Sequence, residues 1–185
     1  FGNSGVEGKI KAIEYARTHN IAYLGLCYGM QLAAVEFARN VCGMTDAHTT
    51  EVNEQTPHPI VDLLPMQKAM LDKNDYVGTM RLGAYPCKVI EGTKVADVYN
   101  QSEISERHRH RYEFNNEYLG DFERAGMIAS GINPNAGLVE IVELKDHPWF
   151  VGVQFHPEYK STVENPHPLF VNFVKEAVKV ASLVH

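Results

Sequence analysis

The first residues that could do chemistry lie in a Gly-x-Cys-x-Gly motif at residues 25–29, centred on Cys27. Glycine tolerates the tight backbone geometry and close approach that a sharp turn from a strand into a helix requires. A sulfur at such a turn lies near the positive end of the following helix, which favours the thiolate, and the next backbone N–H can face an oxyanion. A free cysteine is more often a small buried residue, but this frame favours a nucleophile.

A second candidate site follows the apolar run at residues 149–155, where His156 is separated from Glu158 by one proline. A thiol nucleophile needs a base to accept and return its proton, and the base needs a partner on its other ring nitrogen. With nine histidines in the chain, a lone histidine would ordinarily belong to the surface or the core. The position directly after an apolar strand favours His156 as the base and Glu158 as the carboxylate that orients it.

The remaining cysteines carry no such frame. Cys42 and Cys87 complete an odd set of three without a C-x-x-C spacing, which disfavours a disulfide framework and a structural zinc site. We therefore assign these two cysteines to packing and expect no metal site.

The elements around Cys27 can be read from apolar spacing. Residues 7–20 fit a helix, residues 21–26 form a short apolar run typical of a buried parallel strand, and residues 28–40 fit a second helix. Strand, turn and helix in this order predict a nucleophile elbow at Cys27.

The rest of the chain predicts an α/β domain with a mostly parallel central sheet and added antiparallel strands. Prolines and polar clusters at residues 52–78 indicate a long surface excursion, and residues 169–183 form an amphipathic helix. Strands are predicted at residues 79–82, 87–90, 109–114, 138–144 and 149–155.

Length and charge limit the class of protein. The 185 residues suffice for one domain, and 17 Lys and Arg against 23 Asp and Glu give a net charge of -6, which disfavours nucleic acid as a partner. No apolar run approaches the roughly 20 residues that cross a bilayer, and the N-terminal sequence lacks the regions of a signal peptide. We expect no membrane association and a cytoplasmic location.

The two motifs together resemble a known family. Gly-x-Cys-x-Gly-x-Gln at residues 25–31, followed far downstream by Gln-Phe-His-Pro-Glu at residues 154–158, is similar to the class I, or triad, glutamine amidotransferases. The resemblance implies their flavodoxin-like α/β fold, a catalytic triad of Cys27, His156 and Glu158, and part of an oxyanion hole from the N–H of Tyr28.

Further segments resemble the CTP synthases within that family, namely residues 5–10, 78–83, 106–113 and 147–150. The resemblance implies a glutaminase domain that hydrolyses L-glutamine and passes ammonia to an N-terminal synthase domain for amination of UTP to CTP. It places ATP and Mg²⁺ in that synthase domain, which also mediates homo-oligomerisation, and requires no cofactor in the glutaminase domain.

The resemblance also implies a set of glutamine-binding residues. Glu51 and Arg111 would hold the ammonium and carboxylate of the substrate, since a zwitterion needs one partner of each charge. The neighbouring Arg107 and Arg109 fit a solvated basic strand face. The segment after the nucleophile would line the pocket through Tyr28, Gly29, Met30 and Gln31.

The sequence departs from the family at three places. Tyr28 stands where many relatives have leucine, and His48 stands where asparagine is usual, close to a substrate-contacting wall. In the family, a Pro-Gly-Gly sequence and several strands and helices precede the position of Phe1, so we expect residues 1–185 to be an N-terminally truncated domain without half of its oxyanion hole.

Two alternatives differ in testable ways. Another Cys-His-Glu hydrolase, such as a γ-glutamyl hydrolase or a GMP synthase glutaminase, would be distinguished by its preference between glutamine and γ-glutamyl peptides. A regulatory or scaffolding module would keep the fold without catalysis, and the intact Cys27, His156 and Glu158 argue against it.

Overall fold

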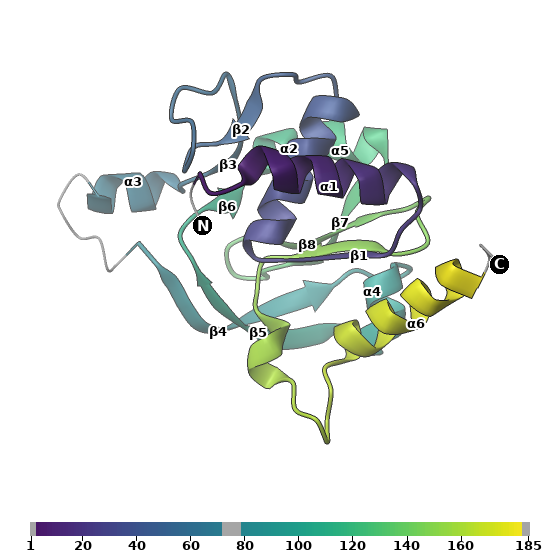
Figure 1. The fold of residues 1–185 in the computed structure, drawn as a ribbon. Coiled ribbons are helices and arrows are strands. Elements are labelled where there is room, and N and C mark those ends of the chain that lie inside the picture. The colour runs from purple at the N-terminus through teal and green to yellow at the C-terminus, as the bar shows by residue number, and fades with distance from the viewer. Residues whose placement is uncertain (1–2, 72–78, 183–185) are drawn as a thin grey trace.

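The computed structural model describes residues 3–71 and 79–182. These residues form a six-stranded mixed sheet with helices on both faces and a small three-stranded sheet at one side (Figure 1). Gly78, the first residue of the family segment at residues 78–83, lies outside the described residues, as does Phe1.

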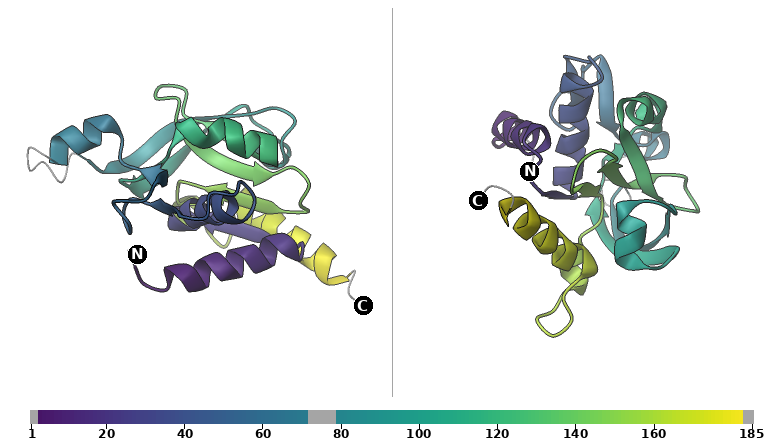
Figure 2. Two further views of the ribbon diagram at one scale, coloured as in Figure 1. Left: turned by 90° about the horizontal axis from the view of Figure 1, so that it is seen from above. Right: turned by 90° about the vertical axis from the view of Figure 1, so that its right-hand side faces the viewer.

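The N-terminal part forms the predicted helix, strand and helix. Helix α1 covers Val6–Thr18, strand β1 covers Tyr23–Leu26, and helix α2 covers Tyr28–Asn40. Figure 2 shows α1 beside α2. Arg17 of α1 and the fully buried Glu36 of α2 join the two helices through a bidentate ion pair with a shortest contact of 2.7 Å. The sequence-based prediction of these three elements is confirmed to within two residues.

The main sheet has the strand order β1-β9-β8-β7-β4-β5. Its later strands are β4 (Arg81–Val89), β5 (Glu103–His110), β7 (Met127–Ile132), β8 (Val139–Leu144) and β9 (Phe150–Val153). The smaller sheet contains β2 (Ala47–Thr49), β3 (His58–Asp62) and β6 (Glu113–Phe114).

The remaining helices connect and cover these strands. They are α3 (Pro65–Leu71), α4 (Lys94–Tyr99), the 3-10 helix η1 (Asn116–Tyr118), α5 (Leu119–Ala125), the 3-10 helix η2 (Pro157–Lys160) and α6 (Pro168–Ser182). Helices α1 and α2 lie on one face of the main sheet, and α4 and α6 lie on the other (Figure 1). Each face therefore has its own apolar core, one built around α2 and one around Trp149 and Leu169.

The mixed α/β fold is confirmed, but the expected excess of parallel strands does not hold within the described residues. Only β1 and β9 pair in parallel in the main sheet, while β9, β8, β7, β4 and β5 form a continuous antiparallel series. Tight connections such as that between β7 and β8 produce antiparallel neighbours, whereas parallel pairing needs a long crossover. Apolar strand sequences alone did not reveal this difference.

Several element bounds also differ from the sequence-based prediction. Two predicted strands at residues 79–82 and 87–90 are one strand, β4, which continues through Pro86. Strand β5 begins at Glu103, earlier than predicted. Every second residue of the strand is buried, but most of the buried ones are polar, namely Glu106, His108 and His110, so an apolar pattern did not reveal its first half. The predicted excursion at residues 52–78 contains β3 and α3.

The His-Pro-Trp-Phe segment at residues 147–150 has a structural role. Nδ1 of the buried His147 accepts a hydrogen bond from the N–H of Trp149 (3.2 Å), so its Nε2 donates to the carbonyl of Ala16 (3.2 Å). This imidazole fixes the start of β9 against the end of α1.

No helix in residues 3–71 or 79–182 is long and apolar enough to cross a membrane.

Candidate active site

Cys27 occupies the sharp turn between β1 and α2, with φ 49° and ψ -101°. A positive φ is sparsely populated by non-glycine residues and is typical of a strained nucleophile elbow. The Cys27 N–H donates to the carbonyl of Val153 (2.7 Å), which fixes the turn against β9. Gly25 is required here because a Cβ would lie 2.8 Å from the carbonyl carbon of Gly29. The predicted elbow is confirmed.

The thiol of Cys27 has polar neighbours from two other strands. Its Sγ lies 4.0 Å from the carbonyl oxygen of Arg109, to which the S–H donates. The Nε2 of Gln154 donates to the same Sγ at 3.7 Å. The backbone N–H of Tyr28 also faces the sulfur and favours its anionic form.

The prediction that Cys27 would favour the thiolate is wrong for this structure. Burial raises the pKa of its thiol to about 12, and the nearby carboxylates of Glu113 and Glu158 raise it further. The N–H groups of Tyr28 and Gln154 oppose this shift but are outweighed by desolvation. Cys27 therefore carries its proton at neutral pH in this structure.

The predicted contact between His156 and Glu158 is confirmed. Nδ1 of His156 lies 2.6 Å from Oε1 of Glu158, and the His156 N–H donates to the carbonyl of Arg107 (2.8 Å). The Glu158 side chain is 44% exposed, whereas that of His156 is 15% exposed. With Nδ1 held by a carboxylate, Nε2 is the nitrogen left for chemistry.

A cavity of about 360 Å³ brings Cys27 and His156 into one lining, although the two residues are separated by most of the chain. The predicted residues Tyr28, Gln31, Glu51 and Arg111 also line it. The lining is completed by Met80, Arg109, His110, Tyr112 and Tyr159.

Two charged groups in this lining are fixed by neighbouring residues. Nε of Arg111 donates to the hydroxyl of Thr79 (3.1 Å), and its carbonyl accepts from Nε2 of Gln67 (2.8 Å). The exposed Glu51 lies close enough to Tyr28 to add to the effect of burial, and together they raise the pKa of that phenol to about 12. The cavity lining thus contains two arginines, Arg109 and Arg111, and one carboxylate, Glu51.

The structure places Gly29, Met30 and Glu158 outside the described lining of this cavity. The carbonyl of Gly29 accepts a hydrogen bond from the hydroxyl of Tyr23 (2.9 Å). Met30 is buried against β9, where its Cα would be 3.1 Å from a Cβ on Gly152. These two residues therefore support the elbow from behind.

His48, which departs from the family, also lies away from the cavity. Its Nδ1 accepts from the N–H of Thr49 (2.9 Å), and its Nε2 lies 3.9 Å from a carboxylate oxygen of Glu7 on α1. Burial, followed by the charge of Arg39, lowers the pKa of its imidazole. The substitution thus changes the contact between β2 and α1.

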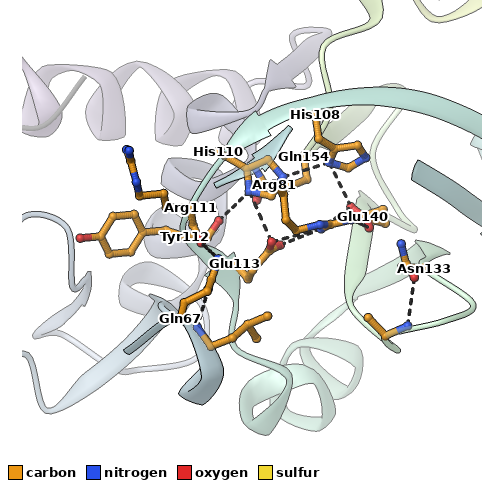
Figure 3. A network of polar contacts seen from close by, with 12 residues as sticks. Gln67, Arg81, His108, His110, Arg111, Tyr112, Glu113, Asn133, Glu140 and Gln154 are labelled. Atoms are coloured by element: carbon orange, nitrogen blue, oxygen red, sulfur yellow. Dashed lines mark hydrogen bonds and ion pairs between the residues drawn. The ribbon is translucent and has the colours of Figure 1, made fainter. Parts of the chain in front are cut away.

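A buried polar cluster, shown in Figure 3, adjoins the cavity through His110 and was not foreseen from the sequence. Arg81 of β4 lies between two buried carboxylates, with its guanidinium 3.1 Å from Glu113 and 2.6 Å from Glu140. Burial raises the pKa of Glu113 to about 8 and raises that of Glu140. A single guanidinium can balance one of the two carboxylates, so the other retains a proton near neutral pH.

Two histidines of β5 join this cluster in defined tautomers. Nδ1 of His110 lies 3.0 Å from the carbonyl of Tyr112 and must donate to it, which leaves Nε2 as an acceptor. Nδ1 of His108 lies 2.9 Å from that Nε2 and is therefore the donor. Burial lowers the pKa of His108 to about 2 and that of His110 to about 3. Both rings are neutral.

Sequence reasoning missed Arg109 and Gln154 as neighbours of the thiol. Arg107, Arg109 and Arg111 are each two residues apart, so they share one face of an extended strand. Because Arg111 was assigned to the site, this spacing could have indicated that Arg109 lies there as well. Gln154 was part of the family motif but received no role. Among residues 3–71 and 79–182, no group of three or more His, Cys, Asp or Glu side chains is arranged to hold a metal ion.

Comparison with known proteins identifies the fold and family. The family model for glutamine amidotransferase class-I matches residues 1–176. This chain belongs to the class-I glutamine amidotransferase family.

Within the class-I amidotransferases, the chain is most informatively compared with CTP synthases. It is 59% identical to CTP synthase of Cytophaga hutchinsonii and 59% identical to that of Caldanaerobacter subterraneus subsp. tengcongensis, covering 96% and 95% of this chain. It covers 32% of each relative, so the chain spans about a third of their length.

A solved structure supports the same match for this class-I amidotransferase. The glutaminase domain of Trypanosoma brucei CTPS, solved with bound acivicin, is 37% identical with a TM-score of 0.89, over 97% of this chain and 68% of that one. A putative GMP synthase protein from Thermoplasma acidophilum, at 18% identity and a TM-score of 0.58 over 96% of this chain and 67% of that one, shares the fold. The chain therefore corresponds to the glutaminase part of CTP synthases.

Proposed function

We propose that the cavity hydrolyses L-glutamine and that the ammonia is used to form CTP from UTP. One observation carries the proposal: the strained Cys27 and the His156–Glu158 pair adjoin one cavity that also presents Glu51 and Arg111. The thiol and imidazole suit amide cleavage, and the two opposite charges suit the α-ammonium and α-carboxylate of an amino acid.

The proposed first step couples deprotonation to attack. Because Cys27 is a thiol in the free protein, its proton passes to Nε2 of His156 as Sγ bonds to the side-chain carbonyl carbon of glutamine. The N–H of Tyr28 stabilises the resulting oxyanion. Collapse breaks the C–N bond, and His156 returns the proton to the departing ammonia.

The second step regenerates the enzyme. His156 removes a proton from water as the water oxygen attacks the carbonyl carbon of the glutamyl thioester. The C–S bond then breaks, glutamate leaves, and His156 returns the proton to the departing sulfur of Cys27. Glu158 holds Nδ1 and thereby keeps Nε2 directed to the reaction. No metal takes part in this half-reaction in the proposal.

The synthetic half of the proposal concerns the parent protein. Its synthase part would bind ATP, Mg²⁺ and UTP, receive the ammonia and form the homo-oligomer, in a cytoplasmic enzyme. The identity to CTP synthases along the described chain supports this assignment over the γ-glutamyl hydrolase and scaffold alternatives.

Cys27→Ala in the intact protein provides the decisive experiment. CTP formation with glutamine should fall to background while CTP formation with ammonium chloride should persist, because only the nitrogen supply passes through the thiol. Equal loss of both activities, with the variant still folded, would contradict the proposal. Acivicin, which is bound in the Trypanosoma brucei relative, should likewise inhibit the reaction with glutamine and spare the reaction with ammonium.

Arg111→Ala tests how the substrate is held. Loss of the guanidinium should raise the KM for glutamine by roughly 30- to 1,000-fold, corresponding to about 2–4 kcal/mol for a buried charge pair. Arg107→Ala is the matched control, because Arg107 is exposed on the same strand face and lies outside the described cavity lining. An unchanged KM in Arg111→Ala would remove Arg111 from the binding site.

A further inference from the structure

A chain of side-chain amides leads from a backbone carbonyl to the sulfur of Cys27. Gln31 Nε2 lies 3.0 Å from the carbonyl oxygen of Tyr112 and 3.2 Å from Gln154 Oε1, and Gln154 Nε2 lies 3.7 Å from Cys27 Sγ. Both glutamines are buried, Gln31 at 4% exposure and Gln154 at 0%.

The orientation of both amides follows from the backbone carbonyl. A carbonyl oxygen only accepts hydrogen bonds, so the Gln31 atom that faces Tyr112 must be its NH₂ group. The same NH₂ group faces Gln154, which must therefore present its oxygen there. The remaining NH₂ group of Gln154 is directed to Cys27.

We infer that Gln154 is a further catalytic residue, which donates a hydrogen bond to the Cys27 sulfur as it becomes anionic, and that Gln31 is the positioning residue that orients it. This inference deepens the proposed glutaminase function and rests on it for its catalytic meaning. A donor fixed before the reaction stabilises developing negative charge without reorganisation. Gln154 lies outside the described lining of the cavity, so it serves the sulfur and not the substrate.

The chemical environment explains why such a donor matters. Burial is the main cause that raises the pKa of the Cys27 thiol and keeps it protonated, and the carboxylate of Glu158 acts in the same direction. The Gln154 donor opposes both effects. The carbonyl of Tyr112 also accepts from His110, which Figure 3 shows beside His108. One backbone oxygen therefore orients both the amide chain and the neutral histidine pair.

The test measures alkylation of Cys27 by iodoacetamide in the intact protein between pH 7 and 9, followed by peptide mapping. In Gln154→Met the rate should fall about tenfold at each pH, equivalent to one pKa unit for the thiol. Cys87, which is 1% exposed, reports any general opening of the fold in the same sample. Gln67→Met is the matched control for loss of a buried amide. Its Nε2 donates to the backbone carbonyls of Thr79 and Arg111 and its Oε1 accepts from the N–H of Leu64, with no described contact to Cys27.

Gln31→Met and the double variant test the orientation step. Gln31→Met should slow alkylation by roughly threefold, and it should add nothing in the Gln154→Met background, because coupled residues are not additive. Independent, multiplying effects would overturn the positioning role of Gln31. An unchanged rate in Gln154→Met, or equal slowing in Gln67→Met, would overturn the role of Gln154.

Ammonia release from glutamine separates this inference from the proposed function. Gln154→Met should lower kcat about tenfold and leave the KM for glutamine within twofold of wild type. If wild-type protein releases no ammonia, the proposed function fails, while alkylation still decides whether Gln154 acts on the sulfur. If wild-type protein is active and Gln154→Met has the same kcat, the inference alone fails. Should Gln154→Met open the fold and speed alkylation of Cys87, Gln31→Met decides: a rate for Cys27 equal to wild type overturns the inference.

Discussion

The rim of the cavity and the buried cluster both combine histidine with glutamate, and they differ in their exposure to water. At the rim of the cavity, the Glu158 side chain that bonds His156 is 44% exposed. In the buried cluster, the side chains of His108 and Glu140 are fully buried, and the two lie 3.7 Å apart. The same residue types therefore occupy opposite environments.

Burial keeps the histidines of the cluster in one protonation state. Desolvation penalises every charged form, and it lowers the pKa of His108 to about 2. The buried histidines are thus locked in the neutral form and act as hydrogen-bonding spacers. The rim pair instead lies at the cavity, where the Glu158 side chain is partly exposed to water. The residue types alone would have made both His–Glu pairs candidates for acid–base chemistry.

The largest effect that sharpens this contrast is expected for His156→Ala. Glutamine hydrolysis should fall by about 100- to 10,000-fold, the range typical for loss of a general acid–base group, while the urea midpoint of unfolding stays close to wild type. His108→Ala is the comparison variant. It should unfold at lower urea because it leaves a cavity and an unpaired His110 acceptor, so a reversed order of activity and stability losses would refute the contrast.

Arg81→Met should be the most destabilising change in the buried cluster. It removes the guanidinium that bridges Glu113 and Glu140, and breaking a buried pair by removing one partner costs about 3–5 kcal/mol. Urea unfolding measures the loss. Arg107→Met, on the exposed face of β5, is the control and should change stability by less than about 0.5 kcal/mol.

Glu113→Gln should remove part of the pH dependence of stability. The folded protein holds the Glu113 proton up to about pH 8, whereas an ordinary glutamate releases it near 4.5, so this group loses its stabilising contribution as the pH rises between those values. An amide mimics the protonated carboxyl at every pH. Between pH 5 and pH 8, the variant should therefore gain roughly 3 kcal/mol relative to wild type.

Urea unfolding at pH 5 and pH 8 tests this prediction. The histidines of the cluster act in the opposite direction, because the unfolded chain binds protons below about pH 6.5 that the folded chain does not. Taking the difference between variant and wild type at each pH removes most of this common contribution. An equal difference at both values would show that Glu113 is ionised throughout.

The smallest effect is expected for Glu158→Gln on stability. The pair is partly exposed, and such pairs contribute only about 0–1 kcal/mol. Glutamine turnover should nevertheless fall, because an amide can hold the imidazole in the wrong tautomer. A loss of stability as large as that of Arg81→Met would show that the rim pair is structural after all.

The sequence by itself predicted the residues of the elbow and the rim. The glycine frame around Cys27, the apolar strand before His156 and the family motifs are local patterns, and local backbone geometry is encoded in short segments. The same patterns located α1, β1, α2 and the C-terminal helix. Cys27, His156 and Glu158 therefore needed no tertiary information to be selected.

Only the tertiary structure decided how these residues are solvated and supported. The desolvation that keeps Cys27 protonated, the pairing of Arg81 with Glu113 and Glu140, and the contact of Gln154 with the sulfur all join segments far apart in the chain. The strand order could not be predicted for the same reason, since an apolar run does not specify the strand with which it pairs. Charge states and hydrogen-bond partners depend on the sum of surrounding atoms, and that sum exists only after the chain has folded.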